Sequence, residues 1–457
     1  MADLFGGFDM LEKILKPEVK EMIEKKEWRE LREWLSSLPA ADIADLLVEL
    51  ENDEEMVIVF RLVPRESRAD VFGLLDVEYQ IKLIKEMSNK HIQDVISDLT
   101  PDDRTELFEE LPGTITQRLL TLLPPEDRRE SLRLLGYPEN SVGRLMTPDY
   151  VAVHPDWTIA KALEHIRRTG KDAETINTVY VIDEESRLID DLPLRRLILA
   201  PPEDKVESIM DRTYVAVSAY EDQEQAVKIV EKYDLVAIPV VDSKNVLIGI
   251  VTVDDILDVL EDEVTEDAHK GGAVLPLGMS YSAASVLTLY KKRIVWLSFL
   301  ALSGFLTGNV LSTFQNTLSS TIYLAFFIPV LIGTGGNTSS QSATLVIRAL
   351  ALGDITMKKW LKVIKKEFLV GMPLGLSMGL VLFIWVYLWK KELVIALVVG
   401  ISASFIVVWA NIIGSILPII LTKIKLDPAV ISQPLLSTFL DISGLLIYFS
   451  IATMIIK

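Results

Sequence analysis

The sequence contains no cysteine and only four histidines among its 457 residues. The absence of cysteine excludes disulfides, thiolate metal sites and cysteine nucleophiles. It also lacks a glycine-rich phosphate loop and a nucleophile elbow, so we expect that the protein is not an enzyme. The first 20 residues mix charged and apolar side chains without the continuous apolar segment of a signal peptide, which predicts that the soluble part stays in the cytosol.

Basic residues are scarce in the first 275 positions, where 32 Lys and Arg face 60 Asp and Glu. Residues 276–457 show the opposite balance, with 14 basic and 5 acidic residues. Such an acidic first part argues against a nucleic-acid partner, because phosphate binding needs clustered Lys and Arg. Charge alone leaves two interpretations open, which are a solvated acidic surface and a surface that binds cations.

Five long apolar stretches follow residue 290, at residues 294–314, 322–347, 368–389, 393–422 and 429–456. Each reaches the ~20 residues that a helix needs to cross ~30 Å of hydrocarbon. Lys and Arg residues cluster before the first stretch, between the second and third, and after the fourth. The positive-inside rule therefore predicts a multi-pass protein of the inner (plasma) membrane, with the amino terminus in the cytosol and the carboxyl terminus outside. Lys390 and Lys391 oppose this topology weakly.

One acidic residue, Asp441, lies near the middle of the last apolar stretch. A carboxylate at that depth costs ~2.5–3.5 kcal/mol on insertion scales, so it normally faces a cavity and marks an ion path. Two alternatives stay open, which are a carboxylate held by a neighbouring Ser or Thr, and a protonated proton relay. Polar and small residues also fill 333–342 of the second stretch, which favours a wetted lining, with an irregular backbone as one form of it, while close helix packing by the glycines is the alternative. Other candidates are Asn411, Gly414, Gln433 and Pro434.

The soluble part divides into two regions. Residues 20–135 show short amphipathic patterns, with proline and acidic residues at several expected helix starts, which is typical of an α-solenoid. Residues 140–262 form a twofold repeat of about 60 residues that mixes helix and strand. Short β-branched runs at 179–182 and 237–241 are the expected strands, and 159–165 and 224–231 the expected helices.

The repeat resembles paired cystathionine-β-synthase (CBS) domains through Met146-Thr147-Pro148 and the pattern Gly249, Thr252, Asp255. Further phrases follow in the apolar region, namely Phe327-Ile328-Pro329, Gly335-Gly336-Asn337, Gln341-Ser342-Ala343-Thr344 and Asp427-Pro428-Ala429 through Asp441. With these phrases the whole chain, from about residue 25 to its end, resembles the MgtE family of magnesium channels.

The resemblance implies a multidomain membrane protein with three regions of different fold class. These are a helical solenoid-like domain, α+β tandem CBS domains and an all-α domain with five transmembrane helices. The expected boundaries are 1–137 for the helical domain, 138–203 and 204–262 for the two repeats, 254–275 for an acidic connecting helix and 284–457 for the membrane domain. It also implies a homodimer whose pore is lined by spans two and five. Asp441 would be the selectivity residue, accompanied by Asn337, Gly444 and Gln433, the last standing where similar members carry Asn.

The resemblance further implies that the connecting helix plugs the pore and that intracellular Mg²⁺ closes it. The acidic side chains that match family positions for metal binding are Glu66, Asp98, Asp102, Asp222, Glu224, Asp234, Asp255, Asp258, Glu263, Glu266 and Asp267, together with Asp441 in the pore. Crowded like charges on one helix repel, and cations between two such helices would relieve this repulsion. A plain solvated surface remains an alternative for each single carboxylate.

ATP is the second ligand that the resemblance implies, with Arg195, Thr252 and Asp255 as the nucleotide-binding residues. The first repeat departs from the family pattern, because Asp190, Pro193 and Arg196 occupy its Gly, Ser and ribose-binding Asp positions.

We therefore expect a magnesium-selective channel for Mg²⁺ uptake, with other divalent cations as further candidate partners. The alternatives are an ion-coupled secondary transporter, in which Asp441 would titrate, and a nucleotide-regulated membrane scaffold without transport.

Overall fold

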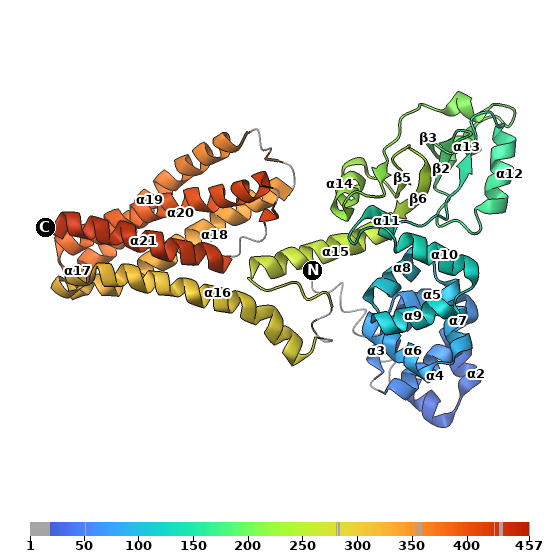
Figure 1. Ribbon diagram of the computed structural model, residues 1–457, viewed down its shortest axis with the longest axis horizontal. Helices are drawn as coiled ribbons and strands as arrows, with labels where there is room; N and C mark the ends of the chain where they lie inside the picture. Colours follow the sequence, from blue (N-terminus) through green and yellow to red (C-terminus); the bar gives the residue numbers. More distant parts are fainter. Residues whose placement is uncertain are drawn as a thin grey trace. The chain divides into compact units, whose positions relative to one another are not determined.

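The computed structural model describes residues 19–50, 52–279, 281, 284–351, 354–355, 359–424, 426–428 and 433–456. The chain forms two compact units, Met1–Glu261 and Asp262–Lys457. Figure 1 shows the helices and strands of each unit with the labels used below.

The first unit begins with short α-helices stacked around one apolar core. Several start directly after or at a proline, as predicted, because proline fixes a helical φ and needs no hydrogen-bond acceptor in the first turn. Pro39 precedes one helix, and Pro101 and Pro125 open two others. The helices are α2 (Trp28–Leu35), α3 (Ala40–Glu49), α4 (Asp53–Leu62), α5 (Arg65–Gly73), α6 (Val77–Glu86), α7 (Asn89–Asp98), α8 (Pro101–Glu110), α9 (Gly113–Leu122) and α10 (Pro125–Leu134).

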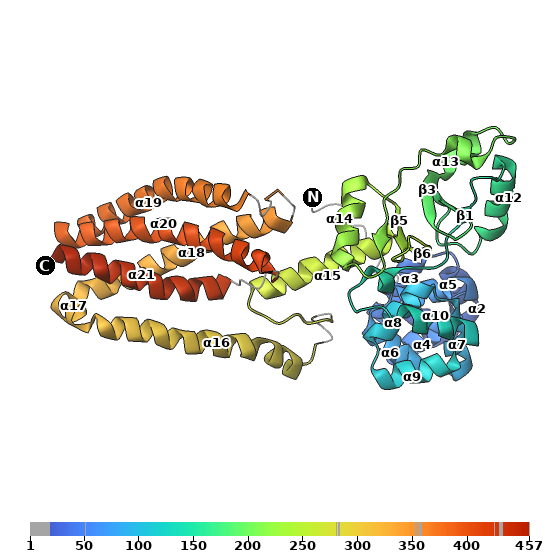
Figure 2. The same cartoon turned by 45° about the horizontal axis from the view of Figure 1, so that its top comes forward.

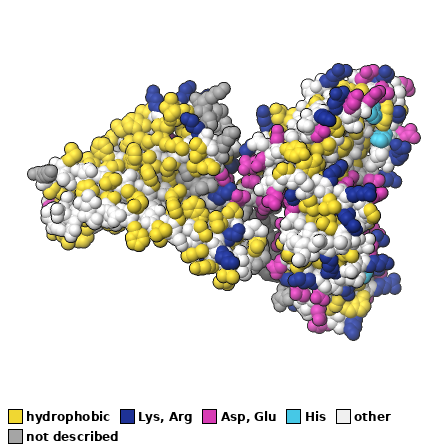
Figure 3. Space-filling view, viewed as in Figure 1, with side chains coloured by type: hydrophobic (Ala, Val, Ile, Leu, Met, Phe, Trp, Pro, Cys, Tyr) yellow, Lys and Arg dark blue, Asp and Glu magenta, His cyan; other side chains and the backbone are white. Residues whose placement is uncertain are grey.

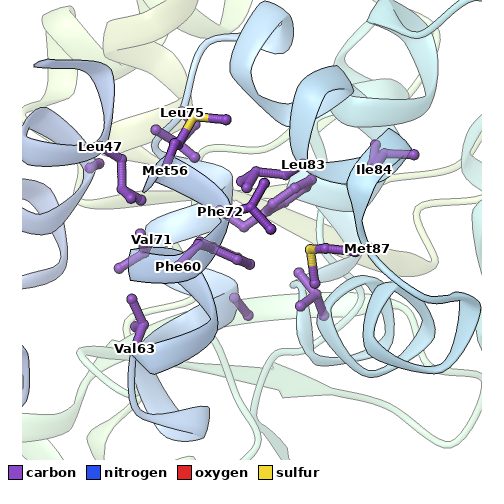
Figure 4. Close-up of a cluster of buried hydrophobic side chains, with 14 of the residues drawn as sticks. Leu47, Met56, Phe60, Val63, Val71, Phe72, Leu75, Leu83, Ile84 and Met87 are labelled. Atoms are coloured by element: carbon purple, nitrogen blue, oxygen red, sulfur yellow. The ribbon is translucent and has the colours of Figure 1, made fainter. Parts of the chain in front are cut away.

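The core of this helical region is made of aliphatic side chains around two aromatic rings. Phe60 of α4 and Phe72 of α5 lie with their ring centroids 6.1 Å apart, and both are at most 2% exposed. Figure 4 shows these rings among side chains from neighbouring helices, including Leu47, Leu83 and Met87. The amphipathic periodicity of the sequence therefore correctly predicted a helical domain.

Two similar α+β repeats follow the short helix α11 (Val142–Leu145), and each contains one three-stranded sheet. In the first, β1 (Ala152–Val153) runs parallel to β2 (Thr178–Ile182), and β2 runs antiparallel to β3 (Leu188–Pro193). The second repeats this order with β4 (Val217–Ser218), β5 (Ala237–Val241) and β6 (Leu247–Thr252). Helices α12 (Ile159–Thr169), α13 (Leu194–Leu199) and α14 (Gln223–Tyr233) and the 3₁₀ turn η1 (Val206–Ile209) complete the repeats. The strands and helices predicted for this region are confirmed.

Helix α15 (Val253–Gly271) begins directly after β6 and continues from the first unit into the second. Its sequence is rich in Asp and Glu, and only Ile256 and Val259 are buried within the chain. The helix coincides with most of the predicted acidic connecting helix and ends before its expected end at residue 275.

In the described part of the second unit, five helical segments are long and apolar enough to cross a membrane. Figures 1 and 2 show these helices side by side, and Figure 3 shows a mostly hydrophobic surface over them. They are α16 (Val286–Thr313), η2 (Ile322–Phe327) with α18 (Ile328–Ala351), α19 (Trp360–Lys390), α20 (Leu393–Lys423) and α21 (Gln433–Ile456), with the short α17 (Gln315–Ser320) after α16. The five predicted spans are confirmed as helices, although residues 429–432 of the last one lie outside the described residues.

Glycine allows close approach between three of these helices. A Cβ added to Gly414 of α20 would lie 2.4 Å from the backbone oxygen of Ser339 in α18, closer than real atoms come. On the other side of α20, a Cβ on Gly375 of α19 would lie 2.6 Å from the carbonyl oxygen of Ser404. Helix α20 is therefore held between α18 and α19 by small-residue contacts of the kind that favour association in membranes.

The prediction of an irregular backbone at residues 333–342 is wrong, because α18 is continuous there. The hydroxyl of Thr334 donates to the carbonyl oxygen of Val330 at 2.7 Å, and Thr338 donates to Thr334 at 2.8 Å. Such back-bonding satisfies these hydroxyls within the helix, so the polar composition does not require unwinding.

Candidate ion pathway and cation-binding clusters

A stripe of polar side chains follows one face of α18. Asn337, Gln341 and Thr344 are four and three residues apart, which places them one above another on an α-helix. All three are exposed within the single chain, and Ser340 between them is partly exposed. Polar side chains with this exposure are poorly suited to lipid, so this face of α18 needs water or a polar partner.

Helix α21 carries a matching stripe. Gln433, Ser437 and Asp441 follow one another at intervals of four residues and therefore share one face. Asp441 lies eight residues into the helix, about 12 Å from its start at 1.5 Å per residue. The side chain of Asp441 is partly exposed.

The two stripes meet in a groove of about 820 Å³. The side chains from α18 are Asn337, Ser340, Gln341, Thr344 and Leu345, and those from α21 are Gln433, Pro434 and Ser437. A Cβ added to Gly336 would lie 3.1 Å from Ser437 Oγ, so the helices touch closely beside this groove. The structure thus brings together the predicted pore residues Asn337 and Gln433.

The other two predicted pore residues lie farther along α21. Asp441 lies one turn beyond Ser437 on the same stripe but is not among the side chains that line the groove. Gly444 is buried, and a Cβ there would come within 3.9 Å of the Ile406 side chain of α20. Its place in the structure is a packing contact with α20.

A second polar cluster lies behind α18, and the sequence analysis had named its members Ser342 and Asn411 but not Glu367. The Ser342 hydroxyl lies 2.9 Å from Glu367 Oε2 of α19 and 3.0 Å from the carbonyl oxygen of Asn411 in α20. The amide Nδ2 of Asn411 donates to Glu367 Oε2 at 3.0 Å and to the Glu367 carbonyl oxygen at 2.7 Å. Glu367 escaped attention because the third span was expected to begin at residue 368, whereas α19 begins at Trp360.

The soluble unit contains a group of carboxylates from four separate segments, which we term the acidic cluster. Its members are Asp102 and Asp103 at the start of α8, Asp149 and Glu174 in loops of the first repeat, and Asp254 and Asp255 at the start of α15. Burial, followed by the charge of Asp102, raises the pKa of Asp255 to about 8. Burial, followed by the charges of Asp102, Asp254, Asp103 and Asp149, raises the pKa of Glu174 to about 7. Burial also raises the pKa of Asp102 to about 6.

These shifts share one physical cause, which is that the carboxylates lack enough positive charge to offset burial and mutual repulsion. A bound divalent cation supplies such charge, and carboxylate oxygens are the ligands that Mg²⁺ prefers. Two predicted ligands, Asp102 and Asp255, belong to the cluster, whereas Glu174 and Asp149 were missed. Across the described residues, however, no three His, Asp or Glu side chains already converge in the geometry of a metal site.

The other predicted ligands of the soluble unit lie at exposed positions with local partners. The side chain of Asp222 accepts from the backbone N–H of Glu224 and caps α14, and Glu224 pairs with Lys228 at 2.8 Å. Asp234 ends the same helix in a left-handed conformation with φ of 52°. Asp98 lies 3.7 Å from Arg65, and Glu66 is exposed in the first turn of α5.

The acidic residues of α15 include Asp258, Glu263, Glu266 and Asp267. The Nζ atom of Lys270, near the end of this helix, lies 2.5 Å from Glu266 Oε1 and 2.6 Å from Asp427 Oδ2. Although burial acts to lower the pKa of Lys270, its hydrogen bonds to Asp427 and Glu266 raise it overall. Within the second unit, therefore, an ion pair joins α15 to the segment between α20 and α21.

The first repeat uses its unusual residues for structure. Asp190 is fully buried and accepts from the backbone N–H groups of Asp211 and Arg212, both at 3.0 Å. Arg196 donates to Asp211 Oδ2 at 2.8 Å, and Arg195 is exposed on α13. In the second repeat the hydroxyl of Thr252 donates to Asp255 Oδ2 at 2.9 Å. Of the predicted nucleotide residues, only Thr252 and Asp255 are in contact.

Comparison with known families covers most of the chain. Residues 328–451 match the family described as a divalent cation transporter, and residues 38–140 match the MgtE intracellular N domain. Residues 142–203 and 206–262 each match the CBS domain.

Individual relatives extend this agreement. The chain is 40% identical to the magnesium transporter MgtE of Thermus thermophilus, over 98% of this chain and 100% of that protein. It is 34% identical to the magnesium transporter MgtE of Bacillus subtilis, over 87% and 91% of the two chains. A crystal structure of the cytosolic domain of the Mg²⁺ channel MgtE in complex with ATP is 37% identical, with a TM-score of 0.51, and covers 53% of this chain and 98% of that one. The chain therefore belongs to the MgtE family of magnesium transporters.

Proposed function

We propose that this protein is a magnesium-selective channel that mediates Mg²⁺ uptake and is closed by Mg²⁺ on the cytosolic side. The observation that carries the proposal is the pair of polar stripes on α18 and α21, which meet in one groove within an otherwise apolar bundle. The family, whose relatives are named magnesium transporters, supports the same conclusion.

The chemistry of the stripes suits hydrated Mg²⁺. This ion prefers six oxygen ligands at about 2.1 Å and keeps several of its waters. Amide and hydroxyl oxygens of Asn337, Gln341 and Ser437 can accept hydrogen bonds from those waters. The carboxylate of Asp441, one turn beyond Ser437, supplies the negative charge that favours a divalent cation over a monovalent one.

We propose a homodimer, because one groove is open on its side and one carboxylate offsets only half of the charge of Mg²⁺. Two chains related by a twofold axis would place two copies of Asp441 on opposite sides of one path. The mass of the detergent-solubilised protein, measured by light scattering, should correspond to two chains, and a monomeric mass would refute this arrangement.

The transport proposal is tested with the full chain reconstituted in liposomes that contain a Mg²⁺-sensitive dye. A channel should admit Mg²⁺ down its own gradient at a rate that does not change when the proton and sodium gradients are collapsed. Uptake that stops when either gradient is removed would instead identify an ion-coupled transporter.

The acidic cluster supports the proposed gating. Mg²⁺ bound among Asp102, Glu174 and Asp255 would hold α8, the first repeat and the start of α15 together, and repulsion would separate them when Mg²⁺ is withdrawn. Only a difference in Mg²⁺ affinity between the two arrangements can shift their populations. Because α15 continues from this cluster into the membrane unit, its movement would carry the signal to the pore.

Limited proteolysis of the full chain tests this gating. We expect millimolar Mg²⁺ to slow cleavage of the soluble unit, and a combined Asp102→Asn and Asp255→Asn protein to lose that protection. Glu185→Gln, an exposed acidic residue that pairs with Arg187, is the matched control and should retain it. Equal cleavage of the unchanged chain with and without Mg²⁺ would contradict the proposal.

We also propose that the first unit lies on the cytosolic side of the plasma membrane and that the end of α19 faces the outside of the cell. Lys390, which opposes the charge rule, lies 4.2 Å from the ring centre of Trp389 and 4.7 Å from that of Tyr323. Contact with aromatic faces stabilises a cation at a membrane interface, so this lysine needs no cytosolic position. A cysteine introduced at Lys391 should react with a membrane-impermeant thiol reagent applied to intact cells, and failure to react would reverse the topology.

ATP is the proposed nucleotide ligand, supported by the ATP complex of the related cytosolic domain. Thr252 and Asp255 are the candidates at the second repeat, and Arg195 is the candidate phosphate contact. Binding of labelled ATP should weaken in the Thr252→Ala and Arg195→Ala proteins. Unchanged binding in both would refute this assignment.

A further inference from the structure

Glu367 contacts two other helices from a position outside the groove. Its carboxylate oxygen Oε2 receives hydrogen bonds from Ser342 of α18 and Asn411 of α20, and its backbone oxygen receives a second one from Asn411. Ser342 is 2% exposed and Asn411 4% exposed. A carboxylate that joins three apolar helices through neutral donors is costly to place there, which indicates a specific role.

The donor groups of the Asn411 side chain are both paired. Its amide nitrogen has two hydrogens, and the structure gives each one an acceptor on Glu367. The hydroxyl of Ser342 lies between Glu367 Oε2 and the backbone oxygen of Asn411. These bonds favour one arrangement, because a shift of α18 or α20 would leave the buried donors of Ser342 and Asn411 without acceptors.

The hydrogen bonds around Glu367 bear directly on which way the polar stripe of α18 faces. Ser342 is the neighbour of Gln341, and successive side chains on a helix differ in direction by about 100°. When Ser342 is held toward α19 and α20, Gln341 and Asn337 must face the groove. The contact between α18 and α20 also includes the close approach of Gly414 to Ser339, which fixes the spacing of the two helices.

We propose that Glu367 is a positioning residue that sets the rotation of α18 about its own axis and so keeps the polar stripe facing α21. This inference rests on the proposed ion pathway, because the stripe matters for transport only if ions follow the groove. Glu367 acts through Ser342 and Asn411 and does not line the groove.

The natural absence of cysteine offers a direct test. A single Gln341→Cys substitution in the full chain places a reporter thiol on the groove face, and its reaction with a water-soluble thiol reagent measures access from water. Added Glu367→Ala should lower the rate of reaction, because loss of one interhelical hydrogen bond of average strength shifts the equilibrium between the two orientations of α18 by about threefold. Added Glu367→Gln keeps a carbonyl acceptor for both donors and should preserve the rate.

Tyr448→Phe is the matched control for loss of a buried hydrogen bond elsewhere in the bundle, because the Tyr448 hydroxyl donates to the Leu324 carbonyl oxygen at 3.0 Å. It should leave the reporter rate unchanged. In liposomes, and without the reporter, Glu367→Ala should lower Mg²⁺ flux per folded protein and reduce the preference for Mg²⁺ over Na⁺, whereas Glu367→Gln should retain both.

Three results would overturn the proposal. The reaction rate of the reporter thiol could stay unchanged in Glu367→Ala, or it could fall as much in Glu367→Gln or in Tyr448→Phe as in Glu367→Ala. The second would mean that the charge acts directly, and the third that any weakening of the bundle suffices. A reporter that behaves as expected in a chain that transports no Mg²⁺ would support the positioning of α18 and would refute the proposed transport.

Discussion

The raised pKa values in the acidic cluster make the stability of the folded protein depend on pH. Asp102, Glu174 and Asp255 titrate near 6, 7 and 8 in the folded protein, against 3.8 for Asp and 4.5 for Glu. Between these values the folded state holds more protons than the unfolded state, so the free energy of unfolding falls as pH rises. We expect the melting temperature of the Mg²⁺-free protein to fall between about pH 5 and about pH 8.

Mg²⁺ should remove most of this fall in melting temperature with pH, because the bound ion supplies the positive charge that protons supply at low pH. The measurement is a series of thermal melts of the full chain with chelator or with millimolar Mg²⁺. A melting temperature that rises with pH in chelator would contradict the assignment of these carboxylates.

A second single-residue prediction concerns Asp190. Its buried carboxylate accepts from the backbone N–H groups of Asp211 and Arg212 and so fixes the segment between the two repeats. Asp190→Ala should lower stability by roughly 2–3 kcal/mol, because it removes the charged acceptor of these backbone hydrogen bonds. Asp156→Ala, at a surface loop position, is the control, and equal melting of the two variant proteins would refute the structural role.

Single side chains were predictable where one segment carried the whole signal. Asp441 stood out because a lone carboxylate interrupts an apolar stretch, and Asn337 belonged to a recognisable phrase. Glu174 gave no such signal, because its partners Asp102 and Asp254 lie about 70 to 80 residues away along the chain and only the fold brings them together. Glu367 was hidden by three neighbouring lysines, which placed it in an expected loop.

Among the helices, the clearest prediction concerns the end of α15. The ion pair of Lys270 with Asp427 ties this helix to the segment that leads into α21. Lys270→Met should weaken that contact and raise the Mg²⁺ flux that remains at closing Mg²⁺ concentrations, while flux at low Mg²⁺ stays the same. Lys228→Met removes an exposed pair on α14 and should change neither flux. Lower residual flux in Lys270→Met would show that the ion pair does not favour the closed channel.

The contact between α18 and α20 predicts a sharp difference between glycines. Gly414→Ala adds an atom that would lie 2.4 Å from the Ser339 backbone, so the helices must separate, at a cost of roughly 1–3 kcal/mol. Gly308→Ala in α16 meets nothing within 4 Å and should be neutral. Thermal melts in detergent compare the two, and equal stability would refute the close approach.

Helices and strands followed from periodicity, β-branched runs and proline positions, so the first repeat and the five spans were predicted well. The irregularity expected at residues 333–342 was wrong, because composition does not reveal that threonine hydroxyls satisfy themselves on their own helix. Helix ends also differed, since α16 and α19 extend beyond the apolar core through lysines that continue the helical hydrogen bonds.

Across the whole chain, two units of opposite net charge carry the two functions that we propose, which are Mg²⁺ sensing and Mg²⁺ passage. The acidic unit carries the clustered carboxylates that read Mg²⁺, and the apolar unit carries the polar groove. Continuous helix from residue 253 to residue 271 gives both units a shared element. Several cations bound together would make closure steep in Mg²⁺, because each one favours the same arrangement.

Mg²⁺ flux through the Asp441→Asn protein is the most direct test of the proposed pathway. The substitution keeps the size of the side chain and removes its charge, and flux is measured in liposomes at low Mg²⁺, where the channel is open. We expect flux per folded protein to fall about tenfold or more, which corresponds to at least ~1.4 kcal/mol of lost stabilisation of the ion. Mg²⁺ flux and preference over Na⁺ that match the unchanged chain would contradict the proposal that ions pass along α18 and α21.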